Sequence, residues 1–576
     1  MDSRTAAHVL NQIGALLELT GAPRFNARAY QKAGRAILAL GADDLAPLLK
    51  SGELQKTPNV GPATVAVIRD LIENGESSLL ERLNDETPRG LVQMARVPGL
   101  GIAKVRLIHS ELGVETLEDL EKAARDGRLA KIKGFGPKTA ERVLGGIQFA
   151  RDSGRRSLYH RGLLEATVLR DGVGRHPDVI EAFIAGTVRR HLEVIGDIDI
   201  VAVCSADPAG VARSFADQPA VKEAIENGPR VSIRYVDDTR MDLWCATPAE
   251  AAVTLWRATG SESHILGIES YASERGFTLK DASLVDPRGK PVRIGSEADF
   301  FNALALDTIP PELREGTGEI EAAASESLPD LITSDDIKGA LHCHSTWSDG
   351  GATIAEMADA AKARGWKYIG ITDHSQAAFY AGGMKRDEIL RQHEEIDELN
   401  SRMKGFRILK GIECDILPGG ELDYGDDTLD MFEYVVGSVH SQFKLGEREM
   451  TARILKAMDD PRLTILGHAT GRLLLSRQPY EVDIDAVLDK AVETGTVLEL
   501  NCDPHRMDLD WRYVREAKEK GITIEIGPDA HSEIELDNVE SGVGMARKAW
   551  LTRNDVLNTK SAAQVLKVAA AKRKRI

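Results

Sequence analysis

Residues 341–350 read LHCHSTWSDG, and this stretch decides the fold predicted for the C-terminal part of the chain. His342 and His344 stand two residues apart, which on a strand places both imidazoles on one face. Asp349 follows in the same loop. Five later segments also end an apolar run in a side chain that can bind metal: TDHS (372–375), GIECD (411–415), GSVHS (437–441), LGHA (466–469) and PDAHS (528–532). We predict seven strands, which end near His344, Asp373, Glu413, His440, His468, Cys502 and Asp529.

Helical patterns separate these strands, and repeated βα units predict a parallel barrel. In such barrels the reactive side chains lie where strands end and βα loops begin. Eight of the 14 histidines follow residue 336, and six of those eight fall at predicted strand ends. Converging imidazoles and carboxylates suit zinc, manganese or iron. The region is therefore predicted to be a metal-dependent phosphoesterase.

On these motifs, residues 337–570 resemble a polymerase-and-histidinol-phosphatase (PHP) domain. The resemblance implies a distorted (βα)7 barrel that holds up to three Mn²⁺ or Zn²⁺ ions, and no ligand position of the family is missing. The first metal would take His342, His344, Glu413 and Asp529, the second Glu413, His440 and His468, and the third Asp349, His374 and His531. We also expect Asp373 to orient a neighbouring ligand, and Arg506 either to contact phosphate or to form a surface salt bridge.

A second group of carboxylates lies in GTVRRHLEVIGDIDIVAV (186–203). Asp197 and Asp199 alternate with Ile198 and Ile200, so both carboxylates share one strand face. Asp242 recurs in RMDLW on a predicted neighbouring strand. Three carboxylates on adjacent strands can hold two Mg²⁺ or Mn²⁺ ions for phosphoryl transfer.

This segment resembles the palm of a family X DNA polymerase, and the similarity extends over residues 1–320. It implies that Asp197, Asp199 and Asp242 bind two metals. The implied nucleotide-binding residues are Gly186, Thr187, Arg189, Thr259, Gly260 and Ser261, and PPELRE (310–315) would belong to the thumb. Arg257-Ala258 replaces the family's aromatic pair, and Ile265 replaces an Asn that contacts the nucleotide. These departures leave open whether the palm polymerises DNA.

The first 150 residues have the apolar spacing of helices, as at Leu10, Ile13 and Leu17. A Gly-containing loop recurs there three times, in TPNVGPATVAVI (57–68), VPGLGIAKVRLI (97–108) and IKGFGPKTAERVL (132–144). The copies resemble helix-hairpin-helix motifs, whose amides bind DNA phosphate without reading sequence. The first copy is degenerate, because Asn59 replaces its leading Gly. The predicted DNA-binding residues are Gly99, Gly101, Lys104, Gly134, Gly136 and Lys138.

Composition sets broad limits on these predictions. The net charge is -17, yet residues 1–155 carry 22 Lys and Arg against 19 Asp and Glu. The five scattered cysteines argue against a disulfide framework, and we expect a cytoplasmic monomer with no membrane partner.

The domains expected are a helical DNA-binding domain (1–85), helix-hairpin-helix fingers (86–155), palm and thumb (156–312), a linker (313–336) and the PHP domain (337–576).

Taken together, the chain resembles bacterial family X polymerases that carry a PHP domain. This implies a DNA repair enzyme that joins a metal-dependent 3′–5′ exonuclease to a gap-filling polymerase. Its partners would be gapped, nicked or 3′-recessed DNA and deoxynucleoside triphosphates. Two alternatives stay open: a nuclease whose silent palm only positions DNA, and a small-molecule phosphatase with an inherited DNA-binding front end.

Overall fold

The computed structural model forms two compact units, Met1–Arg155 and Arg156–Ile576. It describes the whole chain except residues 2, 41, 43, 88–90, 92–93, 96, 98–99, 154–155, 219–220, 236–238, 281 and 575–576. The two units are described separately below.

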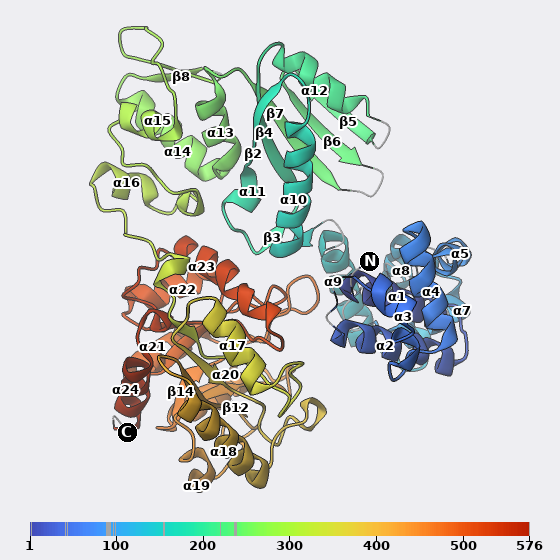
Figure 1. Ribbon diagram of the computed structural model, residues 1–576. Helices are drawn as coiled ribbons and strands as arrows, with labels where there is room; N and C mark the ends of the chain where they lie inside the picture. The colour runs from blue at the N-terminus through green and yellow to red at the C-terminus, as the bar shows by residue number, and fades with distance from the viewer. Residues whose placement is uncertain are drawn as a thin grey trace. The chain divides into compact units, whose positions relative to one another are not determined.

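The N-terminal unit is helical, as predicted, and has two apolar cores. Leu10 and Ile13 are fully buried in the core that contains the first helices, which confirms the amphipathic spacing. The second core lies among residues 91–147 and also includes Leu19 of the first helix. The helices are α1 (Ser3–Leu19), α2 (Arg24–Ala39), α3 (Ala46–Ser51), η1 (Leu54–Lys56), α4 (Pro62–Asn74), α5 (Ser78–Glu86), α7 (Ile102–Leu112), α8 (Leu117–Arg125), η2 (Leu129–Lys131) and α9 (Pro137–Ser153) (Figure 1).

The second unit begins with a five-stranded sheet in the order β2-β4-β7-β6-β5. Strands β4 and β7 run parallel, and the other neighbours are antiparallel. Helices α10 and α12 pack against this sheet (Figure 1), which confirms an α+β palm. Its elements are β1 (Ser157–Leu158), α10 (Tyr159–Gly174), β2 (Val179–Ile184), α11 (Gly186–Arg189), β3 (Val194–Ile195), β4 (Ile198–Cys204), α12 (Pro208–Ala216), β5 (Val221–Asn227), β6 (Arg230–Tyr235) and β7 (Arg240–Ala246).

A mostly helical region follows the palm, around a core that contains Trp256, Phe300 and Phe301. Its elements are α13 (Ala251–Thr259), α14 (Glu262–Glu274), β8 (Thr278–Lys280), β9 (Ser283–Val285), α15 (Glu297–Ala303), η3 (Pro311–Leu313), α16 (Glu319–Ala324) and η4 (Ser334–Asp336). The segment predicted as a linker, 313–336, is packed in part, because Arg314 and Glu319 are buried.

The C-terminal part is a seven-stranded parallel sheet in sequence order, which confirms the predicted barrel. The backbone N–H of His344 donates to Ala530 O (2.8 Å), so the first and last strands meet and the barrel is nearly closed. Helices α17, α18, α20, α22 and α23 pack on strands of this sheet (Figure 1). Cys343 and Cys414 lie in the apolar core, as predicted.

The strands of the barrel are β10 (Gly339–Ala340), β11 (Tyr368–Ile371), β12 (Arg407–Asp415), β13 (Tyr434–Ser438), β14 (Leu463–Leu466), β15 (Val497–Asn501) and β16 (Ile524–Gly527). The helices are α17 (Ile354–Ala363), η5 (Phe379–Ala381), α18 (Arg386–Arg402), α19 (Asp426–Leu429), α20 (Glu447–Met458), α21 (Ile484–Thr494), α22 (Trp511–Glu519), η6 (Ile534–Asp537), α23 (Asn538–Lys548), η7 (Leu557–Thr559) and α24 (Ala562–Arg573). Among the described residues, no helix is long and apolar enough to cross a membrane.

Helix α23 joins the barrel to the palm through a buried lysine. The ammonium of Lys548 forms an ion pair with Glu315 and donates to the backbone carbonyl of Arg190 (3.2 Å). Arg190 in turn pairs with Glu315 (2.8 Å) and donates to the carbonyl of Thr259 (2.6 Å). Arg547 forms a further pair with Glu312 (2.7 Å). The barrel therefore contacts residues beside the predicted nucleotide pocket.

Candidate functional site

The barrel brings all nine predicted metal ligands together at the carboxyl ends of its strands. Among the described residues, the groups whose ligand atoms all lie within 4.8 Å of one another are His344 with Asp349, His374 and His531; His342 with His344 and Asp529; and His374 with Glu413 and His440. Parallel strands present their carboxyl ends on one side, so residues up to 187 positions apart, such as His344 and His531, meet there.

Glu413, at the end of β12, is the centre of this arrangement. One of its oxygens, Oε1, lies 3.4 Å from His342 Nε2, 3.3 Å from His440 Nε2 and 3.0 Å from His468 Nε2. Its other oxygen lies 2.8 Å from His374 Nδ1. A carboxylate in this position can bridge two cations, as the resemblance implied for Glu413.

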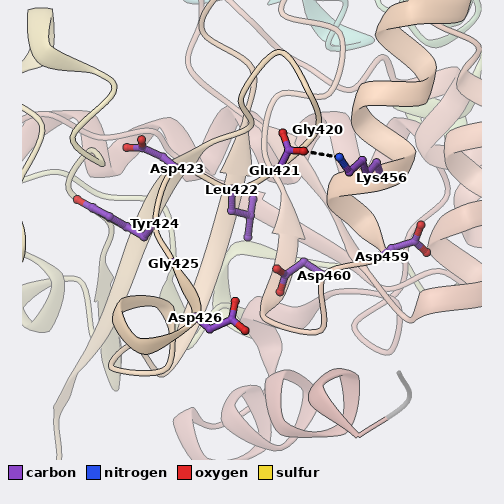
Figure 2. A pocket seen from close by; sticks show the side chains of 10 residues that line it. All are labelled: Gly420, Glu421, Leu422, Asp423, Tyr424, Gly425, Asp426, Lys456, Asp459 and Asp460. Atoms are coloured by element: carbon purple, nitrogen blue, oxygen red, sulfur yellow. Dashed lines mark hydrogen bonds and ion pairs between the residues drawn. The ribbon is translucent and has the colours of Figure 1, made fainter.

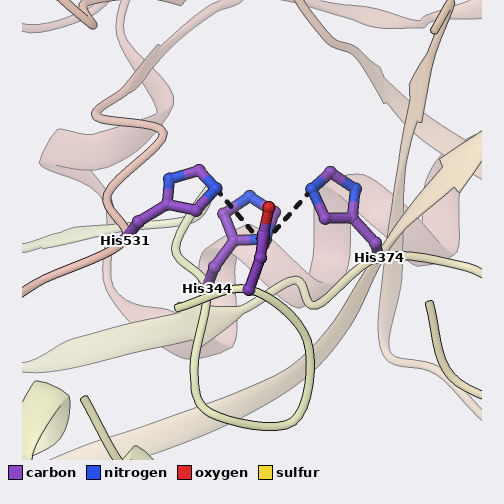
Figure 3. Close-up of side chains that lie close together, drawn as sticks. His344, His374 and His531 are labelled. Atoms are coloured by element: carbon purple, nitrogen blue, oxygen red, sulfur yellow. Dashed lines mark ion pairs between the residues drawn. The ribbon is translucent and has the colours of Figure 1, made fainter. Parts of the chain in front are cut away.

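Asp529 Oδ1 completes the first predicted group, at 3.6 Å from His342 Nε2 and 3.4 Å from His344 Nε2. The third group surrounds Asp349 Oδ1, which lies 3.5 Å from His374 Nε2 and 3.4 Å from His531 Nε2. Figure 3 shows the rings of His344, His374 and His531 turned toward a common point. His344 Nδ1 is also 3.9 Å from Asp349, so His344 and His374 each stand between two groups.

These donors fit divalent cations. Among the described residues, His342 Nε2, both ring nitrogens of His344 and Glu413 Oε2 are buried and have no hydrogen-bond partner. Buried polar atoms are rarely left unsatisfied unless an ion or water completes them. Burial and the neighbouring His531 and His374 together lower the pKa of His344 to about 3. The imidazole is therefore neutral, which is the form that binds metal.

Three polar residues that the sequence reasoning did not single out orient these ligands. His342 Nδ1 donates to Glu499 Oε1 (2.5 Å), and His440 Nδ1 donates to Asp415 Oδ1 (2.8 Å). Asn501 donates to Asp529 Oδ2 (3.0 Å). Such partners fix the ring and raise ligand basicity. The i, i+2 spacing of Glu413 with Asp415, and of Glu499 with Asn501, is the sequence signal that could have identified them.

Asp373 acts on a loop, not directly on a ligand side chain. Its carboxylate accepts hydrogen bonds from Ser345 N (2.8 Å), Ser345 Oγ (2.6 Å), Ser348 Oγ (2.5 Å) and Gln392 Nε2 (2.7 Å). Burial raises its pKa to about 6, although these hydrogen bonds oppose the rise. Asp373 therefore holds the loop that carries Asp349.

Two ligand positions have strained backbones. His468 has a φ of 23° and Asp529 a φ of 50°, values that side chains other than Gly rarely adopt. Strain of this kind concentrates at functional sites. Beside them, Arg506 Nε lies 3.2 Å from Asp529 Oδ2, with its side chain 18% exposed. Arg506 thus forms a salt bridge at the site itself, within reach of a bound phosphate.

An acidic hollow of about 560 Å³ lies elsewhere on the same domain. Figure 2 shows Glu421, Asp423, Asp426, Asp459 and Asp460 around it, with Lys456 paired to Glu421. None of the nine predicted ligands lines this hollow. The metal cluster is therefore a separate feature.

In the palm, the register of β4 and β7 places Asp199 directly beside Asp242. Asp197 is exposed just before β4. Asp242 forms an ion pair with Arg230 (2.7 Å), and Asp199 accepts a hydrogen bond from Trp244 Nε1 (3.1 Å). Burial and the neighbouring Asp197 and Asp242 together raise the pKa of Asp199 to about 7. The predicted neighbouring strands are confirmed, but two of the three carboxylates already have partners within the protein.

Of the predicted nucleotide-binding residues, Gly186 lies against a palm carboxylate, and Arg189 contacts Thr259. Gly186 has a φ of 57°, and a Cβ there would lie 1.9 Å from Asp199 Oδ2, so only Gly fits. Arg189 makes a bidentate pair with Glu297 (2.6 and 3.1 Å) and donates to Thr259 Oγ1 (2.8 Å). Ser261 caps α14, beside Gly260. Among the described residues, the buried hydroxyl of Thr187 has no hydrogen-bond partner.

The Gly loops of the N-terminal unit have a common geometry. Gly61 and Gly101 immediately precede α4 and α7 as their N-caps, and Gly136 precedes α9. Asn59 adopts a φ of 67°, so it takes the left-handed conformation that Gly134 has in the third copy (φ 94°). A Cβ at Gly101 or Gly136 would meet nothing within 4 Å. The space around these two glycines would admit a larger side chain. Packing therefore does not explain why they are glycines, which favours their predicted role in binding DNA at an open surface.

Lys104 is exposed on α7, with its ammonium 5.9 Å from the Phe135 ring. It therefore lies close to the third Gly loop. Gly99 and the side chain of Lys138, both predicted to bind DNA, lie outside the described residues. Their roles stay predictions.

Three protein families match parts of the chain. The PHP domain matches residues 340–529, the DNA polymerase beta thumb residues 254–315, and the SAM-like helix-hairpin-helix tandem residues 92–148. These matches confirm the fold class predicted from the motifs. They also place PPELRE (310–315) within the thumb match.

Relatives of known description cover either the whole chain or part of it. The DNA polymerase/3′-5′ exonuclease PolX of Bacillus subtilis is 36% identical over 565 residues, which span 97% of this chain and 98% of the relative. Probable phosphatases from a Thermoanaerobacter species and from Caldanaerobacter subterraneus are 29% and 27% identical, over 38% and 39% of this chain. Because the first similarity runs from end to end, the chain belongs to the PolX family of DNA polymerase/3′-5′ exonucleases that carry a PHP domain.

Proposed function

We propose that this chain is a DNA polymerase and 3′–5′ exonuclease that processes and fills DNA ends during repair. The observation that carries the exonuclease assignment is the convergence of nine donors, Glu413 among them, at the strand ends, several of them buried without hydrogen-bond partners. The end-to-end similarity to the Bacillus subtilis enzyme supports both activities.

In the barrel, we assign His342, His344, Glu413 and Asp529 to one metal, Glu413, His440 and His468 to a second, and Asp349, His374 and His531 to a third. Mn²⁺ or Zn²⁺ suits these donors. When bound, such cations activate water and stabilise the attacking and leaving oxygens of a phosphodiester. The chain itself orients the rings through Glu499 and Asp415, and Arg506 is placed to pair with the scissile phosphate.

In the palm, we assign Asp197, Asp199 and Asp242 to two Mg²⁺ or Mn²⁺ ions. Gly186, Thr187, Arg189, Thr259, Gly260 and Ser261 would receive a deoxynucleoside triphosphate. The Arg189–Glu297 pair must open, or share its guanidinium, for Arg189 to contact phosphate. Gapped, nicked or 3′-recessed DNA is the expected substrate, and the Gly loops of residues 1–155 would hold its backbone.

A DNA-end assay with one variant per site tests this assignment. With Mn²⁺, the wild-type protein should shorten a labelled primer from its 3′ end, and with deoxynucleotides it should fill a gap. His342→Ala should remove the shortening and keep gap filling, whereas Asp197→Ala should do the reverse. Shortening that persists in His342→Ala would overturn the exonuclease assignment.

A nuclease with a silent palm is the second candidate function. Arg230 already neutralises Asp242, Glu297 already holds Arg189, and Arg257, beside Ala258, pairs with Glu269 (2.9 Å). Equally negligible gap filling by the wild-type protein and Asp197→Ala would support this candidate. Rapid hydrolysis of a phosphate monoester, with DNA left intact, would instead support the small-molecule phosphatase.

A further inference from the structure

Two exposed aromatic side chains stand on the loop between β11 and α18. Phe379 is 84% exposed, more than any other large hydrophobic side chain among the described residues, and Tyr380 is 64% exposed. Their rings contact edge to face, with centroids 6.0 Å apart. Exposed aromatic surface of this kind contributes little to packing and is typical of a binding site.

The loop starts directly after His374, a predicted metal ligand, and its last residues are hydrogen-bonded back to the same residue. Met384 N donates to the carbonyl of His374 (2.9 Å), so residues 375–383 form a closed excursion from His374. A Cβ at Gly383 would lie 1.9 Å from Ser375 O, so this closure requires Gly. The position of the aromatic pair is thus tied to the backbone of His374.

Two further contacts hold the loop from the side. Ala377 N donates to Asp423 (2.7 Å), and Gln376 N donates to the Tyr424 hydroxyl (3.1 Å). Asp423 and Tyr424 follow β12, the strand that carries Glu413. The loop is therefore anchored to two strands of the metal site, and its exposed tip is held in place before any ligand binds.

The end of this loop lies beside Asp349, a ligand of the third predicted metal group. A Cβ at Gly382 would be 3.4 Å from Ser348 O, and Ser348 directly precedes Asp349. Partial desolvation and the nearby carboxylates of Asp415, Glu413 and Asp349 together raise the pKa of the Tyr380 hydroxyl to about 12. An aromatic pair therefore borders the mouth of a site that we assign to phosphodiester cleavage.

We propose that Phe379 and Tyr380 form a stacking platform for unpaired nucleobases at the 3′ end of the DNA strand under degradation. This inference rests on the proposed exonuclease function. Aromatic side chains stack on any base, because every base has a π face. The platform gives the barrel a preference for frayed or mismatched 3′ ends, because their bases are already unstacked.

The test measures stacking directly on the full-length protein. The probe is a short single-stranded oligonucleotide with 2-aminopurine as its 3′-terminal base, joined by a phosphorothioate linkage that slows hydrolysis. Stacking on an aromatic ring quenches 2-aminopurine fluorescence. We expect the wild-type protein to quench this probe with Mn²⁺ and with chelator, and to quench an internally placed 2-aminopurine less.

The variant Phe379→Ala/Tyr380→Ala should lose this quench and bind the probe roughly tenfold more weakly. Phe379→Trp, which keeps an aromatic face, should retain the quench. Phe25→Ala is the matched control, because Phe25 is equally exposed, at 82%, in the other unit. Unchanged quench and affinity in the double variant would overturn the platform.

A degradation assay distinguishes failure of this inference from failure of the proposed exonuclease function. In 3′-end degradation with Mn²⁺, the double variant should raise KM for single-stranded and mismatched ends far more than it lowers kcat, because the stacking is uniform binding. If wild-type degradation is absent or survives His342→Ala, the exonuclease assignment fails. If degradation depends on His342 but KM does not depend on the aromatic pair, the platform alone fails.

Discussion

The barrel and the palm both gather carboxylates for metals, but they surround them differently. In the barrel, Glu413 and Asp529 lie buried among imidazoles whose other nitrogens are held by Glu499 and Asp415. In the palm, Asp242 pairs with the guanidinium of Arg230. Imidazoles can lose a proton and bind a cation through nitrogen, whereas a guanidinium stays charged and occupies the place of a cation. The barrel therefore leaves its donors open to a cation, whereas a cation at Asp242 in the palm must displace Arg230.

The largest expected effect comes from the centre of the barrel. Glu413→Gln removes the charge shared by the predicted metal groups, so exonuclease activity should fall roughly a thousandfold. Gap filling should stay within about twofold, because distant sites act independently. Glu421→Gln, on the exposed acidic hollow, is the matched control and should retain both activities. Metal content after dialysis, measured by mass spectrometry, should fall only in Glu413→Gln. Equal losses in both variants would show that Glu413 has no special role in retaining metal.

Substitution of Lys548 tests how much the contact between the barrel and the palm contributes to stability. Lys548→Met leaves Glu315 without its buried ammonium, although Arg190 still pairs with it, so the free energy of unfolding should fall by about 2–3 kcal/mol. Lys520→Met is the control, because it breaks only the exposed pair with Asp489 and should cost less than about 1 kcal/mol. Urea unfolding of both variants measures the difference. Equal changes would show that the junction contributes no more than a surface ion pair.

Glu499 and Glu525 are both buried carboxyl groups beside the metal site, so their variants show which of the two supports metal binding. Glu499→Gln should weaken metal binding or exonuclease activity by about 10- to 100-fold, since it removes the partner of His342. Burial and the neighbouring Glu499 together raise the pKa of Glu525 to about 8, which favours its protonated form at neutral pH. Glu525→Gln should therefore change little. Metal titration of both variants checks this order, and a larger loss in Glu525→Gln would contradict it.

The smallest effect is expected in the palm. Arg230→Gln removes the ion pair that competes with metal at Asp242, so the Mg²⁺ concentration for half-maximal gap filling should fall about two- to fivefold. The pair is partly exposed, which limits its strength. Arg213→Gln, which loses only a long surface pair with Glu226 (3.7 Å), is the control. An increased Mg²⁺ requirement in Arg230→Gln would show that Arg230 assists the palm.

Sequence reasoning predicted the barrel well because its signal is local. Each strand end carries its own reactive residue, and a βα repeat brings those ends together whatever the detailed packing. The i, i+2 pair of His342 and His344 alone indicates a shared strand face. The orienting residues Glu499 and Asp415 were missed, because a carboxylate on a strand resembles any other until its partner is known.

The palm shows the opposite case. The alternation at Asp197 and Asp199 predicted a strand, and Asp242 predicted its neighbour. The sequence could not reveal that Arg230 pairs with Asp242 or that Glu297, 108 positions away, holds Arg189. Such pairs depend on register and on the packing of separate elements.

The sequence alone led to the prediction of nine metal ligands at strand ends, three palm carboxylates on two neighbouring strands and the repeated Gly loops. These predictions follow from strand and turn periodicities, which act over a few residues. The tertiary structure was needed to show how the donors converge on Glu413, how Lys548 joins the barrel to the palm and where Phe379 and Tyr380 stand. Those relations depend on long-range packing, because they join side chains that are adjacent in space but distant along the chain.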